Sequence, residues 1–128
     1  MCLMSCGLWP APRRTLVAAI VVETRVQEVF HLQRSTHGLA PFLDSLARTG
    51  ATLVLPARLP SRTLVWRIAR ASGLAVAIAP ASLVAALREV AGFEDHPPQL
   101  TAALVARLAN FPLFLDQLGF PPRPRTRW

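Results

Sequence analysis

Three short, uninterrupted apolar runs constrain the fold of this 128-residue chain more than any other feature of its sequence. They fall within 15–22 (TLVAAIVV), 51–58 (ATLVLPAR) and 74–80 (LAVAIAP). Continuous rather than alternating apolar residues are typical of strands that are covered on both faces, as in a parallel sheet. The runs are far shorter than the roughly 20 residues that span a bilayer. The first lacks a cleavage site of the signal-peptide type, so we expect a cytoplasmic protein with no membrane span.

Between and after these runs, apolar residues recur at three- and four-residue steps, which predicts helices. Thr36, Ser61 and Ser82 stand where N-caps belong, and glycine follows each helix, at 50, 73 and 92. One helix between the second and third runs matches a right-handed β-α-β crossover. Residues 23–37 are open to two interpretations, a continued strand or a short helix. The stripe of the first complete helix consists of Leu39, Phe42, Leu43 and Leu46.

These patterns predict an α/β fold: a small three-stranded parallel sheet of β-α-β units with a helical C-terminal extension. Pro98 suits the first position of a helix in that extension. The expected organisation is a loose N-terminal leader at 1–14, a single α/β domain at 15–120 and a basic, proline-rich tail at 121–128.

The chain carries a large excess of positive charge. The formal net charge is +7, and the basic residues are all arginine because the sequence contains no lysine. Such a balance favours contact with nucleic acid, acidic membrane or phosphorylated ligands, although a compositional bias explains it equally well. Cys2 and Cys6 are too few for a disulfide scaffold or a metal site, so we expect no metal and no cofactor.

The fold class nominates a binding site at the carboxyl ends of the strands, where open α/β sheets hold their ligands. Helices that begin there direct backbone N–H groups toward the same place. The chain supplies arginines and serines at these ends, and the candidate residues for a phosphate or carboxylate are Arg25, Arg58, Ser61, Arg62 and Ser82. The alternative is that the serines only cap helices and the arginines are solvated.

A second set of arginines is interleaved with tryptophan and predicts sequence-independent contact with nucleic acid. Trp66 lies among the arginines of the second helix, and the tail ends in tryptophan. The alternative is a solvated helix face and a disordered end. The candidate residues are Arg67, Arg70, Arg123, Arg125, Arg127 and Trp128.

Catalytic motifs are lacking. No glycine-rich phosphate loop and no G-x-S-x-G elbow occurs, and the carboxylates show no persuasive acid/base spacing. We therefore expect a non-enzymatic binding or interaction domain for an anionic small ligand or a protein partner. Two alternatives stay open: a nucleic-acid-binding protein, and a fragment of a larger α/β enzyme. Self-association is also expected, because a three-stranded sheet has unpaired edges.

One short run resembles a known family. The sequence IARASGLAVA at 68–77 is similar to the helix-turn-helix of LacI-type repressors. The resemblance implies a DNA-recognition helix at 75–83. That segment lacks the polar side chains that read base edges, and Pro80 would break the helix. No DNA-reading residue of the family therefore carries over to this chain, and 74–80 is predicted to be a strand.

Overall fold

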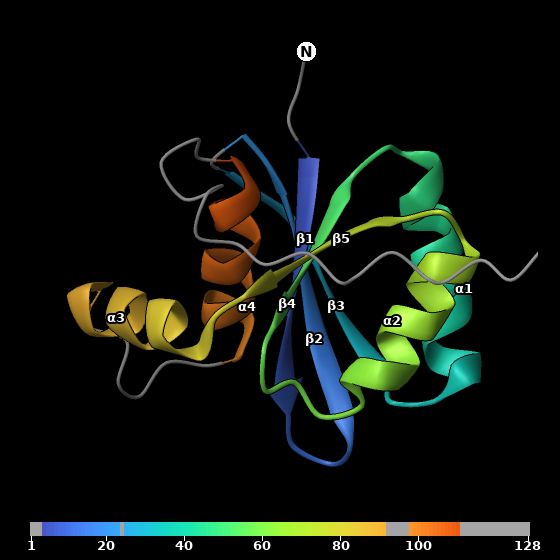
Figure 1. Cartoon of the computed structure of the whole chain (residues 1–128), viewed down its shortest axis with the longest axis horizontal. Helices are drawn as coiled ribbons and strands as arrows, with labels where there is room; N and C mark the ends of the chain where they lie inside the picture. Colours follow the sequence, from blue (N-terminus) through green and yellow to red (C-terminus); the bar gives the residue numbers. More distant parts are fainter. Residues whose placement is uncertain (1–3, 24, 92–97, 111–128) are drawn as a thin grey trace, which may run out of the picture.

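A computed structural model describes residues 4–23, 25–91 and 98–110 (Figure 1). Five strands form one sheet: β1 (Met4–Ala11), β2 (Thr15–Val22), β3 (Arg25–Gln33), β4 (Thr52–Pro56) and β5 (Ala75–Ala79). The helices of the described part are α1 (Thr36–Arg48), α2 (Arg62–Ala71), α3 (Ala81–Ala91) and α4 (Pro98–Arg107), and the 3-10 turn Leu108–Asn110 follows α4. The strand order is β3-β2-β1-β4-β5.

The sheet is mixed, which corrects the predicted three-stranded parallel sheet. Strands β4 and β5 are parallel neighbours joined through α2, as the crossover pattern predicts. Strand β2, however, runs antiparallel to both β1 and β3. On its other side, β4 pairs in parallel with β1 and not with β2. The mixed α/β class is confirmed, and the all-parallel topology was wrong.

The source of the error is β1, which lies inside the segment expected to be a loose leader. Strands disfavour glycine and proline, so Gly7 and Pro10, with Pro12 just after them, predict an irregular segment at 4–11 rather than a strand. Strand β1 pairs with β2 along its whole length but with β4 only through Ser5–Gly7. Pro10 therefore lies where β1 has a neighbour on one side, the position in which a sheet tolerates proline.

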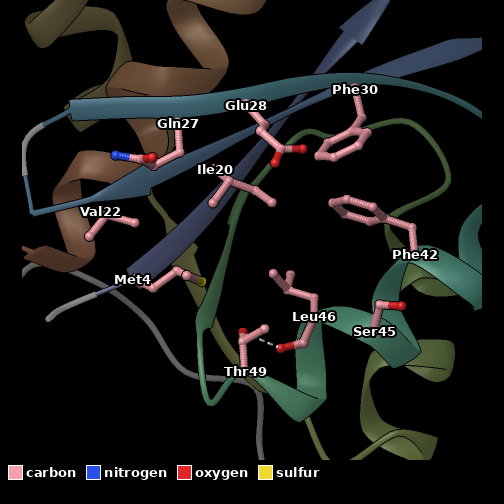
Figure 2. A pocket seen from close by; sticks show the side chains of 10 residues that line it. All are labelled: Met4, Ile20, Val22, Gln27, Glu28, Phe30, Phe42, Ser45, Leu46 and Thr49. Carbon is pink, nitrogen blue, oxygen red and sulfur yellow. Dashed lines mark hydrogen bonds between the residues drawn. The ribbon is translucent and has the colours of Figure 1, made fainter.

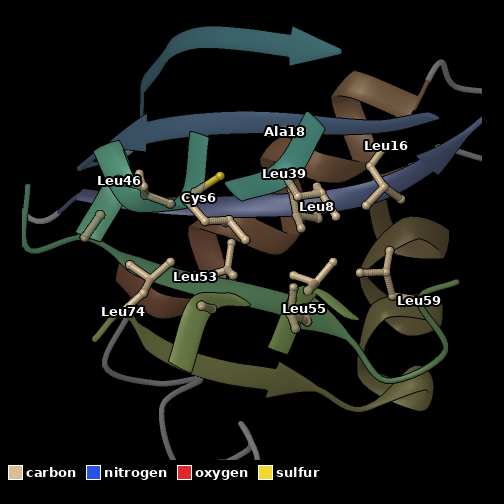
Figure 3. Close-up of a cluster of buried hydrophobic side chains, with 14 residues drawn as sticks. Cys6, Leu8, Leu16, Ala18, Leu39, Leu46, Leu53, Leu55, Leu59 and Leu74 are labelled. Atoms are coloured by element: carbon tan, nitrogen blue, oxygen red, sulfur yellow. The ribbon is translucent and has the colours of Figure 1, made fainter. Parts of the chain in front are cut away.

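The first face of the sheet is covered by α1 and α2 (Figure 1). Even-numbered residues of β1 and β2 point to this face, among them Cys6 and Leu8, and they meet the stripes of the two helices. Figure 3 shows leucines from strands and helices interdigitating in this layer. Fully buried leucines of the cluster include Leu8, Leu16, Leu39, Leu43, Leu53 and Leu55.

The second face is covered by α4, which approaches β1 closely because small residues meet at the contact. A Cβ atom added at Gly7 would lie 2.1 Å from the carbonyl oxygen of Ala102 and 2.5 Å from the backbone nitrogen of Ala106. The buried Ser5 hydroxyl donates a hydrogen bond of 2.5 Å to the carbonyl oxygen of Ala106. Pro98 begins α4, as its position in the sequence predicts.

None of the three predicted N-cap side chains caps its helix in the structure. Ser35, not Thr36, caps α1 and accepts a hydrogen bond of 3.1 Å from the backbone N–H of Gly38. Ser61 precedes α2 in a left-handed conformation, with φ 62°, and makes no side-chain cap hydrogen bond. Ser82 is the second residue of α3 rather than its cap. Within the described residues, no helix is long and apolar enough to cross a membrane.

Candidate functional site

The carboxyl ends of β1, β4 and β5 meet at one edge of the sheet because these strands run in parallel. Strand β3 also ends there, since Gln33 and Ala11 both pair with Thr15. In Figure 1 the β1–β2 hairpin projects from this edge at the bottom of the view. The edge is thus the place where an open α/β sheet would hold a ligand, and we refer to it as the carboxyl edge.

A pocket of about 300 Å³ opens at the carboxyl edge. The end of β1, the end of β4 with the turn after it, and one side of α3 form its walls. Among the lining residues that the structure describes, the charged side chains are Arg58 and Arg88, and none is a carboxylate. The lining residues are Trp9, Pro10, Pro56, Ala57, Arg58, Ala81, Val84, Ala85 and Arg88.

Arg88 is oriented by Trp9. Its guanidinium carbon lies 5.4 Å from the centroid of the Trp9 ring, a distance typical of a cation–π contact. One turn of helix before Arg88, Val84 is 4% exposed and packs with the second-face core, so α3 is held with its Arg88 side toward the pocket. The pocket thus combines an aromatic wall, apolar prolines and positive charge, which is an environment suited to an anion with an apolar body.

The residues that the sequence analysis assigned to one anion site do not all lie together in the structure. Arg58 lines the pocket and is exposed. Arg62 does not line it, because its guanidinium donates a hydrogen bond of 2.7 Å to the carbonyl oxygen of Ala57 and so closes the turn before α2. Exposed Ser61 and Ser82 lie at the same edge without lining the pocket. Arg25 begins β3 and lies at the opposite edge, since β2 is antiparallel.

Sequence reasoning missed Trp9 and Arg88. Trp9 lay in the segment taken for a leader, and Arg88 falls in the last turns of a helix rather than after a strand. The alternation along β1 was an available signal. Ser5, Gly7 and Trp9 share one face of β1, and that face leads directly to the carboxyl edge.

The β1–β2 hairpin adds further positive charge to this edge. Arg13 and Arg14 both adopt left-handed backbone conformations, with φ of 62° and 56°. Such positions favour Gly, Asn or Asp, and a left-handed residue of another type costs roughly 1–2 kcal/mol. The backbone N–H of Arg34 donates a hydrogen bond of 3.1 Å to the carbonyl oxygen of Arg14, so a third arginine follows the end of β3 at the same place.

The arginines predicted to contact nucleic acid lie partly within the described structure. Arg67 and Arg70 are exposed on α2, and the guanidinium carbon of Arg70 lies 5.5 Å from the ring centroid of the half-buried Trp66. The candidates in the tail, Arg123, Arg125, Arg127 and Trp128, fall outside the described residues.

No group of His, Cys, Asp and Glu within the described ranges could hold a metal ion. Comparison with known proteins assigns the chain to no family, since no family model and no curated protein matches its sequence.

Proposed function

We propose that this protein is a non-enzymatic binding domain that holds a small anionic ligand, bearing a phosphate or a carboxylate, in the pocket at the carboxyl edge. The observation that carries the proposal is the convergence of Arg58 and Arg88 on a pocket that no carboxylate lines among the residues described by the structure. Guanidinium groups bind phosphate and carboxylate through two parallel hydrogen bonds, which fixes the orientation of the anion as well as its charge.

The rest of the pocket limits the ligand. A volume of about 300 Å³ is at the lower end of the range for small-molecule sites. Trp9, Pro10 and Pro56 offer apolar and aromatic surface next to the two arginines. The ligand that suits these walls carries a compact, flat apolar group attached to its anionic group.

Phenyl phosphate is a suitable probe, with inorganic phosphate and phenol as its two halves. We expect phenyl phosphate to bind more tightly than either half, as measured by isothermal titration calorimetry. Arg58→Gln and Arg88→Gln should each weaken binding by about 10- to 100-fold, because each removes a charge-assisted hydrogen bond worth about 1.5–3 kcal/mol. Arg62→Gln should have a smaller effect, because this guanidinium is engaged with Ala57.

Arg48→Gln is the matched control. Arg48 lies on α1, away from the pocket, and forms an exposed ion pair of 3.1 Å with Asp44. Its replacement removes the same charge and should leave the affinity for phenyl phosphate unchanged. Equal losses in Arg48→Gln and Arg58→Gln would show that net charge rather than the pocket attracts the anion, and would contradict the proposal.

Nucleic-acid binding is the second candidate function, favoured by the exposed Arg67 and Arg70 beside Trp66. An aromatic ring next to guanidinium groups can stack a base while the charges contact the backbone. The test is the affinity for a single-stranded oligonucleotide, which should fall steeply between ~50 and ~200 mM salt. The double variant Arg67→Gln/Arg70→Gln should weaken that binding and leave phenyl phosphate binding intact. An oligonucleotide affinity that this variant does not change would exclude α2 as the nucleic-acid surface.

A further inference from the structure

A second and larger cavity, of about 450 Å³, lies between α1 and the sheet at the edge opposite the carboxyl edge. Met4 begins β1 and Val22 ends β2, so both mark this opposite edge. The second half of α1 and its C-cap residue close the cavity from the other side through Phe42, Ser45 and Thr49. Figure 2 shows these side chains surrounding one open space.

The walls of this cavity are apolar and partly aromatic. Met4, Ile20, Phe30 and Phe42 are partly buried and pack against the first-face core. The rings of Phe30 and Phe42 have centroids 5.2 Å apart and are tilted by 57°, the arrangement that aromatic pairs prefer. Both rings border the cavity (Figure 2).

One carboxylate faces this apolar space. In Figure 2 the side chain of Glu28 points from β3 into the cavity, between Ile20 and Phe30. Glu28 is the charged residue of the lining. Glu28 forms no ion pair with another described residue. Arg25, on the same strand, is not part of the lining.

The local backbone places Glu28 there. Strand β3 alternates normally from Leu32 to Glu28, so Glu28 shares the α1 side of the sheet with Phe30. The pairing then shifts between Ile20 and Val21, and this irregularity brings Gln27 into the lining as well. Bulges of this kind re-aim side chains and are frequent beside binding sites. Two consecutive polar residues of β3 thus border the cavity, whose other polar lining residues among those described are Ser45 and Thr49.

From this geometry we propose that the cavity binds a small organic monocation, an ammonium group attached to an apolar or aromatic body. The ammonium group donates hydrogen bonds to the Glu28 carboxylate. Its charge also lies within reach of the Phe30 and Phe42 rings, which attract cations through their faces. The apolar body fills the space beside Met4 and Ile20, displacing water from the walls.

The opposite charges of the two pockets make this site independent of the proposed anion site. Within the described part of the chain, a carboxylate and no arginine line the cavity, whereas arginines and no carboxylate line the pocket at the carboxyl edge. A cation would be repelled by the carboxyl edge and an anion by Glu28. Each ligand class therefore reports on its own site.

The experiment compares three probes that share one body and differ in charge: 2-phenylethylammonium, 3-phenylpropionate and 2-phenylethanol. Binding is followed by two-dimensional NMR of the full chain, with the methyl groups of Met4 and Ile20 as local reporters. We expect the ammonium probe to bind with a Kd near or below about 1 mM and to shift these methyl groups. The alcohol should bind more weakly, and the carboxylate should not shift them.

Two variants test the assignment. Glu28→Gln should weaken binding of the ammonium probe at least about tenfold, because it removes the charge but keeps the shape of the side chain. Glu89→Gln, an exposed glutamate of α3, removes the same charge elsewhere and should have no effect. Ser45→Trp should abolish binding by filling the cavity from its exposed border, and thermal unfolding checks that each variant is folded.

Three outcomes would overturn the proposal: no methyl shifts with the ammonium probe, equal shifts with the alcohol, or unchanged affinity in Glu28→Gln. A Glu28→Gln variant that binds the alcohol and the ammonium probe equally well, with wild type preferring the ammonium, would support it. Failure of phenyl phosphate to bind at the carboxyl edge would leave this result untouched.

Discussion

At the scale of single residues, Gly7 is the position where the fold permits least change. The backbone of α4 lies where a Cβ atom would stand, 2.1 Å from the carbonyl oxygen of Ala102. A backbone atom cannot move aside as the end of a flexible side chain can. Either α4 shifts away from β1 or the backbone of β1 deforms, and either response loosens the second-face core.

We therefore expect Gly7→Ala to lower the free energy of unfolding by about 3 kcal/mol, the upper end for overpacking. Chemical denaturation measures this loss. Gly50→Ala is the matched control, because Gly50 has a φ of 75° but no atom within 4 Å of an added Cβ. It should cost about 1 kcal/mol for its left-handed backbone alone. A smaller loss for Gly7→Ala than for Gly50→Ala would contradict the close approach of α4.

Cys6 gives a second prediction at this scale. Its side chain is fully buried in the first-face core, and this burial raises the pKa of the Cys6 thiol above its ordinary value. The thiolate is the reactive form, so the native protein should protect this cysteine. In a Cys2→Ser variant, an aromatic disulfide reagent at about pH 8 should label Cys6 in denaturant but not in buffer. Rapid labelling in buffer would mean that β1 opens readily and is not a stable central strand.

At the scale of elements, β3 and β5 are the two edge strands of the sheet, and β3 carries exposed apolar side chains. Val26 and Val29 on this strand are each 40% exposed. An edge strand with exposed apolar side chains is a template for pairing with another chain. We expect concentration-dependent self-association through β3, which analytical ultracentrifugation detects.

Val29→Lys should reduce this association, because a lysine on an edge strand opposes pairing. The cost in the free energy of unfolding should stay below about 1 kcal/mol, since the site is half exposed. Thr63→Lys adds the same charge at an exposed position of α2 and should leave the association unchanged. A wild-type chain that is monomeric at all concentrations, or equal effects of the two lysines, would exclude β3 as the contact.

The elements also differ in how far their sequences predict them. Strands β4 and β5 and helices α1, α2 and α3 are signalled by continuous apolar runs, helical stripes and glycines. The left-handed φ of 75° at Gly50 and Gly73 confirms the predicted helix ends. The 75–79 segment is extended, so the likeness to a LacI-type recognition helix fails, as Pro80 indicated.

Strand β1 and the direction of β2 were not predicted because the turn between them carries no recognisable hairpin signal. A tight β-hairpin is normally announced by Asn-Gly or Asp-Gly, and here Arg13 and Arg14 occupy the left-handed positions. Without a hairpin signal, the sequence indicates neither a pairing partner for 4–11 nor an antiparallel direction for β2. The candidate site inherited this error, since Arg25 was assigned to the wrong edge and Trp9 to no element.

At the scale of the whole molecule, the question is whether the net charge of +7 acts as a diffuse field or as a local one. Arg13, Arg14, Arg34 and Arg58 all lie at the carboxyl edge. Arg25 and Arg48 lie elsewhere, on β3 at the opposite edge and on α1. Charges gathered at a concave edge focus the potential and raise the local concentration of anions, whereas dispersed charges are screened by salt.

Two charge-matched double variants separate these cases. Arg13→Gln/Arg14→Gln and Arg25→Gln/Arg48→Gln each lower the net charge of +7 by the same two units. If charge at the carboxyl edge attracts anions, Arg13→Gln/Arg14→Gln should slow the association of phenyl phosphate. The slowing should be stronger at ~0.01 M than at ~0.15 M salt, because the Debye length shortens from about 30 to about 8 Å between these concentrations. The other variant should change the rate little at either salt concentration. Equal slowing by both would mean that the arginines act through total charge, and the excess of arginine would then reflect composition rather than a site.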